Sequence, residues 1–249
     1  MVAGAISFNS GVLLFADTDL AAPRKTPRET RRIFHRPYGS SPAVAHSVFV
    51  VREPVDWAPA VFQRCERAVD AVRPAERTIE RMREAIERSL CESYHGGGAD
   101  RELPLFVGLY SPSQPRYSLF RTISSGSTTL REVAGHQTQG NTAYIGHHWI
   151  RDGFNAPRSL DELDLPAVFS LAVDTLGHIR EAHDECGDSA EMVVVHADGH
   201  VSDVQRIVHD SREQRSVTLS RLSRSWAPQP ATRPVAGVRR AATVPFSRL

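Results

Sequence analysis

Histidine and aspartate occur close together at two places in the chain, and these residue types can bind metal ions or transfer protons. His147 and His148 are adjacent, and Ala-Asp-Gly separates His196 from His200. Neighbouring histidines in a strand point to opposite faces, so His147 and His148 rarely share one ion. Asp198-Gly199 is typical of a tight hairpin turn, which needs no ligand role. We therefore predict no metal and no cofactor, with metal binding or a base role as the alternative.

Two further stretches resemble parts of hydrolase active sites when each is taken alone. His95-Gly96-Gly97-Gly98 matches the oxyanion loop of lipase-like α/β-hydrolases. That fold also needs a Gly-x-Ser-x-Gly turn to carry its nucleophile, and Ser124-Ser125-Gly126-Ser127 is not such a turn. We therefore interpret residues 95–98 as the glycine-rich end of a helix.

The composition is that of a globular protein, since 41% of the 249 residues are hydrophobic and 24% are charged. Cys65, Cys91 and Cys186 are odd in number and widely spaced, which favours reduced cysteines in a cytoplasmic protein over a disulfide scaffold or a zinc ribbon. No apolar run approaches the roughly 18–20 residues that span a bilayer, so we expect no membrane partner. The first residues lack the basic region of a signal peptide.

Charge is unevenly distributed along the chain. The net charge is +1, but residues 222–249 contain five arginines and no acid, which leaves −4 on residues 1–221. A basic surface for nucleic acid is therefore not expected on the folded part. Lys25 is the only lysine, so chemistry that needs a titratable lysine has a single candidate.

The spacing of apolar residues predicts the elements that must position these groups. The pattern indicates an α+β fold, in which antiparallel strand pairs alternate with helices that cover them. Strands are predicted at 2–8, 12–16, 31–35, 43–51, 103–110, 117–123, 128–134, 191–196 and 200–208, and helices at 58–72, 73–92 and 165–183. Residues 141–150 are ambiguous between a strand end and a helix start.

These elements form one predicted domain over residues 1–210, followed by a tail over residues 222–249. The tail has four prolines and five arginines in 28 residues. Such a composition buries too little apolar area to offset the loss of chain entropy, so we predict that the tail is disordered.

Several segments, in order, resemble proteasome β-type subunits. Residues 3–18, which read AGAISFNSGVLLFADT, are similar to the family's first two strands, of which the first bears the catalytic N-terminus. Residues 30–34 resemble the strand of the catalytic lysine, and residues 105–110 resemble a central strand. Tyr144-Ile145-Gly146 and residues 184–199 resemble two later passages, so the likeness covers about residues 1–208. It implies the four-layer αββα sandwich of N-terminal-nucleophile hydrolases.

The resemblance also implies where the catalytic residues would lie. In that family a terminal threonine, serine or cysteine attacks an amide, and its own α-amine serves as the base. Aligned on Gly11 and Asp17, the nucleophile position falls on Met1, or on Val2 once the methionine is removed. The lysine position falls on Arg32, which stays protonated at any working pH.

The supporting residues of that family are only partly retained. Asp184 matches the second aspartate, but Gly187 stands at the serine position, and Gly146 precedes His147-His148 instead of Ser-Gly. Asp17 is either a surviving catalytic residue or a cap on the turn after its strand. Arg32 either forms a buried ion pair with Asp17 or lies at the surface.

The resemblance therefore implies a proteasome-like subunit that has no peptidase activity and acts in assembly or as a scaffold. Its partners would be like or related subunits in a ring or another oligomer, contacted through helices such as 73–92. The alternatives are an active peptidase or amidohydrolase of the same fold, and a monomeric protein that binds a ligand in the vestigial pocket.

Overall fold

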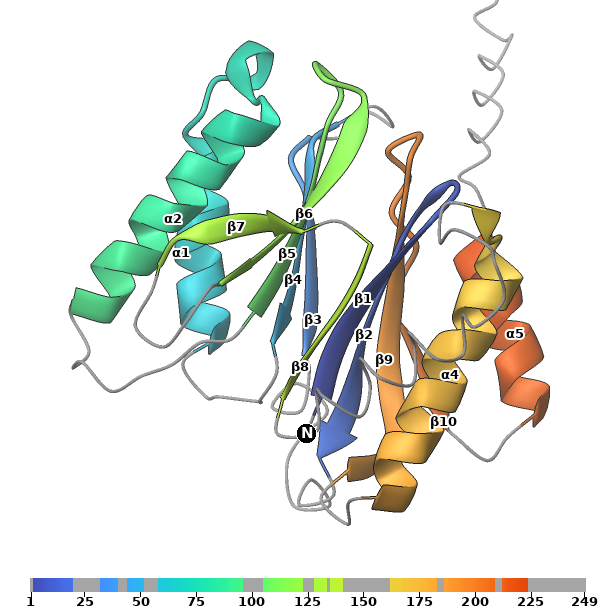
Figure 1. Ribbon diagram of the computed structural model, residues 1–249. Helices are drawn as coiled ribbons and strands as arrows, with labels where there is room; N and C mark the ends of the chain where they lie inside the picture. The colour runs from blue at the N-terminus through green and yellow to red at the C-terminus, as the bar shows by residue number, and fades with distance from the viewer. Residues whose placement is uncertain are drawn as a thin grey trace, which may run out of the picture.

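The computed structural model describes residues 2–19, 32–39, 44–51, 58–95, 105–122, 128–133, 135–140, 162–182, 186–208 and 212–223. These residues form two five-stranded sheets, in which all neighbouring strands are antiparallel (Figure 1). The first sheet contains β1 (Val2–Phe8), β2 (Gly11–Asp19), β8 (His136–Gly140), β9 (Cys186–His196) and β10 (Gln205–Val208), in the spatial order β10-β9-β2-β1-β8. The second contains β3 (Ile33–Pro37), β4 (His46–Val51), β5 (Leu105–Ser111), β6 (Arg116–Thr122) and β7 (Leu130–Val133), in the order β3-β4-β5-β6-β7.

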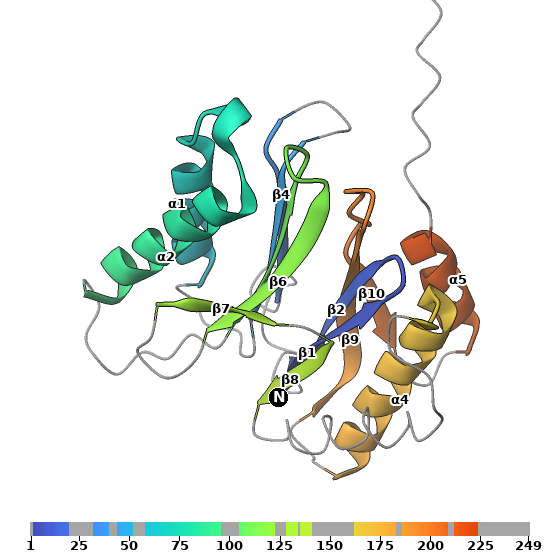
Figure 2. The ribbon, with the colours of Figure 1, turned by 45° about the horizontal axis from the view of Figure 1, so that its top comes forward.

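Helices lie against the outer face of each sheet (Figure 2). On the second sheet lie α1 (Ala58–Asp70) and α2 (Ile79–His95), joined through a short 3-10 turn at Pro74–Glu76. On the first sheet lie α4 (Leu165–Ala182) and α5 (Arg212–Ser223). None of the helices in the described ranges is both long enough and apolar enough to cross a membrane.

The hydrophobic core consists of three clusters, one between the sheets and one under each pair of helices. Along β1 and β2, alternate residues belong to the cluster between the sheets and to the cluster under α4 and α5. Ala5 and Leu14 face the other sheet, while Ile6 and Phe15 face α4. Because both faces of these strands are covered, their sequence is almost continuously apolar. Under the opposite helices, Phe62 of α1 stacks on Phe49 of β4 with ring centroids 4.8 Å apart.

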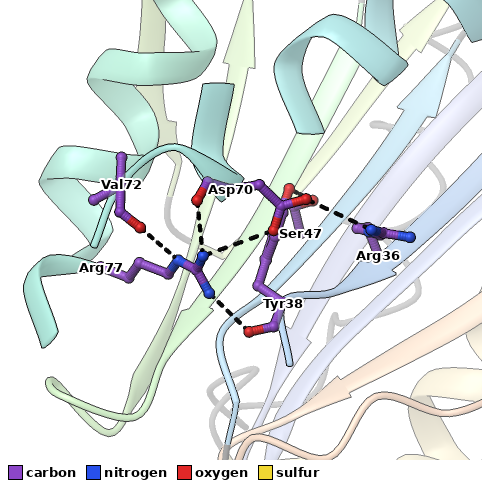
Figure 3. A network of polar contacts seen from close by, with 6 residues as sticks. All are labelled: Arg36, Tyr38, Ser47, Asp70, Val72 and Arg77. Carbon is purple, nitrogen blue, oxygen red and sulfur yellow. Dashed lines mark hydrogen bonds and ion pairs between the residues drawn. The ribbon is translucent and has the colours of Figure 1, made fainter. Parts of the chain in front are cut away.

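Arg77 adds polar contacts to the apolar packing of the α1–α2 pair on the second sheet (Figure 3). The Arg77 guanidinium donates hydrogen bonds to the backbone carbonyls of Tyr38, Val72 and Asp70, at 2.8, 3.0 and 3.0 Å. Arg77 also pairs with the Asp70 carboxylate at 3.7 Å, while the hydroxyls of Tyr38 and Ser47 lie 2.7 Å apart. Arg77 thus links the end of α1, the turn after it and the residue after β3, and the ion pair of 3.5 Å between Arg36 and Asp70 adds a second link between β3 and α1.

The structure has two elements that the residue pattern did not predict. Strand β8 is largely polar, and it pairs with β1 to form the edge of the first sheet. Helix α5 lies beyond residue 210, where the predicted domain ends, and its Leu222 is fully buried against the first sheet. The final hairpin also differs in detail, because β9 begins at Cys186 and β10 only at Gln205.

Candidate functional site

The candidate site lies where β2 ends and β3 begins, and it contains a buried ion pair. The Arg32 guanidinium donates to the Asp17 carboxylate, with Nη1 and Oδ1 2.9 Å apart. The side chains are 0% and 1% exposed, so two opposite charges are almost completely withdrawn from water. Of the two possibilities for Arg32, the buried ion pair is therefore the one observed, and Asp17 is its partner.

The start of β1 meets the same carboxylate. The backbone N–H of Val2 donates to Asp17 Oδ1 at 2.8 Å, and Val2 itself is fully buried. The Val2 N–H and the Arg32 guanidinium therefore share one carboxylate oxygen. Val2 is the first residue of β1 in one sheet, and Arg32 directly precedes β3 of the other sheet. Strands β1 and β2 bring Val2 and Asp17 together because their antiparallel pairing sets Ala3 opposite Ala16.

A second carboxylate, that of Glu191, belongs to this site and was missed in the sequence. Its Oε2 accepts hydrogen bonds from the backbone N–H groups of Arg32 and Ile33, at 2.8 and 3.0 Å. Glu191 lies on β9 opposite Ala16, next to Asp17. The signal available in the sequence was one acidic residue directly before the apolar run Met192–Val195 of the same strand. Glu191 thus positions the backbone from which Arg32 reaches Asp17.

The chemical capacity of this site is narrow. A guanidinium carries five N–H donors and keeps its proton at any working pH, so Arg32 can hold a negative charge but cannot accept a proton. Val2 has an aliphatic side chain, and the nearest hydroxyl along β1 belongs to Ser7, five residues further on. Among the described residues at the site, two carboxylates and a permanent cation are present, and an attacking oxygen or sulfur atom is not.

The other predicted site residues are only partly covered by the structure. Met1, Gly146 and Asp184 lie outside the described residues, as do the histidine pair 147–148 and the segments 96–98 and 124–127. The backbone of Gly187 lies in β9, one residue after Cys186, which pairs with Asp19.

Residues 196–200 form a hairpin turn, as predicted. The Asp198 carboxylate accepts the backbone N–H of His200 at 2.9 Å, and Gly199 has a φ of +90°, which favours glycine. Within the described part of the chain, no group of three or more His, Cys, Asp and Glu side chains is arranged to hold a metal ion.

Two face-to-face antiparallel sheets, flanked by helices and joined at one end through Asp17 and Arg32, define a proteasome-like fold. Three solved structures share it. Anbu from Hyphomicrobium sp. strain MC1 has 15% sequence identity and a TM-score of 0.68, with 88% of this chain and 93% of that chain covered. Anbu (ancestral beta-subunit) from Yersinia bercovieri has 12% identity and a TM-score of 0.68, with 87% and 91% covered.

The third structure is that of a helical assembly of the Anbu complex from Pseudomonas aeruginosa. It has 12% identity to this chain and a TM-score of 0.62, over 87% of this chain and 90% of that chain. No protein-family model matches the chain, and no curated protein matches its sequence. At such low identity, the likeness to the three structures establishes the fold.

Proposed function

We propose that this chain is a proteasome-like subunit that assembles with like or related subunits in the cytoplasm and does not itself cleave peptides. In this proposal the molecule is the four-layer αββα sandwich of the N-terminal-nucleophile hydrolases, and its body serves as a scaffold. The supporting observation is the buried contact of 2.9 Å between Arg32 and Asp17. The sequence resemblance assigns Arg32 to the position of the family's lysine, and a guanidinium there is a permanent cation.

The loss of peptidase activity follows from the residue types at the start of β1. Attack on an amide needs a hydroxyl or a thiol beside a base. The residues at the nucleophile position are Met1 and Val2, a thioether and an aliphatic side chain. The Val2 N–H is bound to Asp17, so the start of β1 is also part of the candidate site. Neither residue can form an acyl-enzyme.

The assembly role is supported by the fold and by a related structure. The chain shares its fold with Anbu, which forms a helical assembly in Pseudomonas aeruginosa. The outer face of α2 carries exposed Glu80, Arg81 and Glu84, which form ion pairs at the surface, Arg81 with Glu84 at 3.3 Å and Glu80 with Arg116 at 3.4 Å. In this proposal, that charged face contacts another subunit.

Two measurements on the purified full chain test this proposal. Light scattering coupled to size exclusion should give a mass well above the 27.5 kDa of one chain at micromolar concentration. Fluorogenic peptides should not be cleaved, and a threonine-reactive epoxyketone should leave the intact mass unchanged, while a proteasome core particle serves as the positive control.

Each part of the proposal has its own contradicting result. Peptide turnover together with an epoxyketone adduct at the N-terminus would establish an active peptidase. A mature chain that opens on threonine, serine or cysteine in the intact-mass measurement would have the same consequence. A single species near 27 kDa without turnover would remove the assembly role and favour the monomeric binding protein.

A further inference from the structure

Four histidines gather at the end of the sheets opposite Asp17 and Arg32. His35 lies in the middle of β3 and His46 is the first residue of β4, and both are on the face that Ile33 and Val48 turn toward the other sheet. The other two, His196 and His200, flank the turn after β9.

The first pair is joined by a hydrogen bond between rings. His35 Nε2 and His46 Nδ1 are 3.0 Å apart, and the two rings stack with centroids 5.2 Å apart. One nitrogen must donate the hydrogen and the other must accept it, so the bond survives with both rings neutral or with one charged. It cannot survive when both rings are charged, because two donors then face each other.

Tyr110 connects this pair to the opposite sheet. Its ring lies 6.3 Å from that of His46, and its hydroxyl donates to the backbone carbonyl of Asp198 at 3.3 Å. A Cβ at Gly199 would lie 2.2 Å from the Tyr110 ring, which shows how closely β5 packs on the turn. Tyr110 therefore contacts the His46 ring on its own sheet and the 197–199 turn of the other sheet.

The second pair fastens the same turn to helix α5. The rings of His196 and His200 stack at 5.4 Å, and His196 Nε2 lies 3.1 Å from the carbonyl oxygen of Leu222. Because a carbonyl can only accept, His196 Nε2 carries the hydrogen. That bond tolerates both protonation states of His196, so acid does not break it.

We propose that His35 and His46, on neighbouring strands β3 and β4, form a proton-sensitive clasp that supports the contact of Tyr110 with the 197–199 turn of the other sheet. At neutral pH the clasp holds Tyr110 against the 197–199 turn, and on acidification it releases Tyr110. The turn meanwhile stays attached to α5 through His196.

The direction of the effect follows from the surroundings of His46. Burial, and then the nearby His35 and His200, lower the pKa of His46 from 6.5 to about 4. Of the described groups, Tyr110 also faces it, while Arg36 and Asp70 lie on the opposite face of the β3–β4 pair. The clasp therefore resists protonation while it is closed. Release becomes easier as the pH falls below 6.5, and the gain levels off near pH 4.

Hydrogen exchange of the full chain at pH 7.5 and pH 5 tests the proposal, with each rate divided by the intrinsic rate of that amide at that pH. Between these two values we expect the opening of residues 46–48, 108–111 and 196–201 to increase on the order of tenfold. The amides of β1 and β2 near Asp17 should keep their protection, because Arg32 keeps its charge.

Two variants and one measurement on the unaltered chain complete the test. His46→Gln should lose most of the pH response at these amides, whereas His178→Gln on α4, away from the cluster, should keep it. In the unaltered protein, one histidine ring should still be neutral at pH 5 by NMR titration, which does not depend on a variant folding. A uniform response over the whole chain, or an unchanged response in His46→Gln, would overturn the proposal.

Discussion

Asp17 joins three separate parts of the chain through one carboxylate. It accepts the N–H of Val2 and the guanidinium of Arg32, and the backbone of Arg32 is in turn held by Glu191. Ion pairs this deeply buried gain little net stability over apolar residues, but removing one partner leaves an uncompensated charge inside the protein. The main effect of the Asp17–Arg32 pair is therefore to fix how the two sheets lie at this end, and its net contribution to the free energy of unfolding is small.

A double-mutant cycle tests this view of the pair. We expect Asp17→Asn and Arg32→Met each to lower the free energy of unfolding by about 3 kcal/mol, and the double variant to lose clearly less than the sum. Urea denaturation measures all three values. As a control, Arg36→Met removes a half-exposed ion pair with Asp70 and should cost at most about 1 kcal/mol. Additive losses at Asp17 and Arg32 would mean that the two charges are not coupled.

Two features favour glycine at position 199, namely its backbone conformation and the nearby ring of Tyr110. Its φ is +90°, and a Cβ would meet the Tyr110 ring at 2.2 Å. We expect Gly199→Ala to destabilise the protein by about 2–4 kcal/mol, since overpacking and backbone strain act together. Gly177 on α4 is the matched control, because a Cβ there meets nothing within 4 Å. Gly177→Ala should stabilise by roughly 0.5–1 kcal/mol in the same thermal melts, and a loss at Gly177 as large as that at Gly199 would refute the argument.

At the scale of elements, the α1–α2 pair depends on the fork shape of Arg77. Arg77 reaches the three carbonyls from three separate nitrogen atoms, Nε, Nη1 and Nη2, whereas a lysine has a single nitrogen atom to place. We expect Arg77→Lys to lower the free energy of unfolding by about 1–2 kcal/mol. Hydrogen exchange should also increase at the end of α1, near Asp70. Arg73→Lys, four residues earlier and 80% exposed, should change the stability by less than about 0.5 kcal/mol. Equal effects at the two arginines would contradict this role.

Elements with a strong apolar period were predictable from the sequence, and a polar edge strand was not. The β1–β2 hairpin and helices α1 and α4 are present as predicted, because their buried stripes are long and regular. Strand β8 reads His-Gln-Thr-Gln-Gly, which has no apolar alternation, and it pairs because β1 offers a free edge. Helix α5 shows hardly any amphipathic pattern, and its position depends on Leu222.

Residues of the candidate site could be predicted only where they lie in a motif of the family that the sequence resembles. Asp17 and Arg32 were found through the family resemblance, and the structure brings them together. Glu191 and the His35–His46 bond depend on the register between strands far apart in the chain, which a residue pattern does not specify.

At the scale of the whole molecule, alkaline stability is limited by two buried acids in the core under α1. Burial raises the pKa of Cys65 from 9 to about 12, and burial also raises the pKa of Tyr38. Both groups stay protonated in the folded chain at a pH where they ionise in the unfolded chain. The contribution of Cys65 and Tyr38 to the free energy of unfolding is therefore fully present below their ordinary pKa values, and it is lost as the pH rises above them.

We expect the free energy of unfolding to fall above pH 9 by about 1.4 kcal/mol per pH unit for Cys65, with Tyr38 adding to the slope above pH 10. Urea titrations from pH 8 to pH 11 measure it. Cys65→Ala should flatten the first part of the slope, although it lowers the starting value. Cys91→Ala should leave the slope intact, and identical slopes in all three proteins would show that Cys65 is not the titrating group.

Glu191 also has a consequence for how separate molecules meet in solution. Strand β3 is the outer strand of its sheet, and unpaired N–H groups on such a strand can recruit a strand from another molecule. The N–H groups of Arg32 and Ile33, at the start of β3, are already bonded to Glu191. The carboxylate thus makes this edge a poor template for aggregation through strand addition.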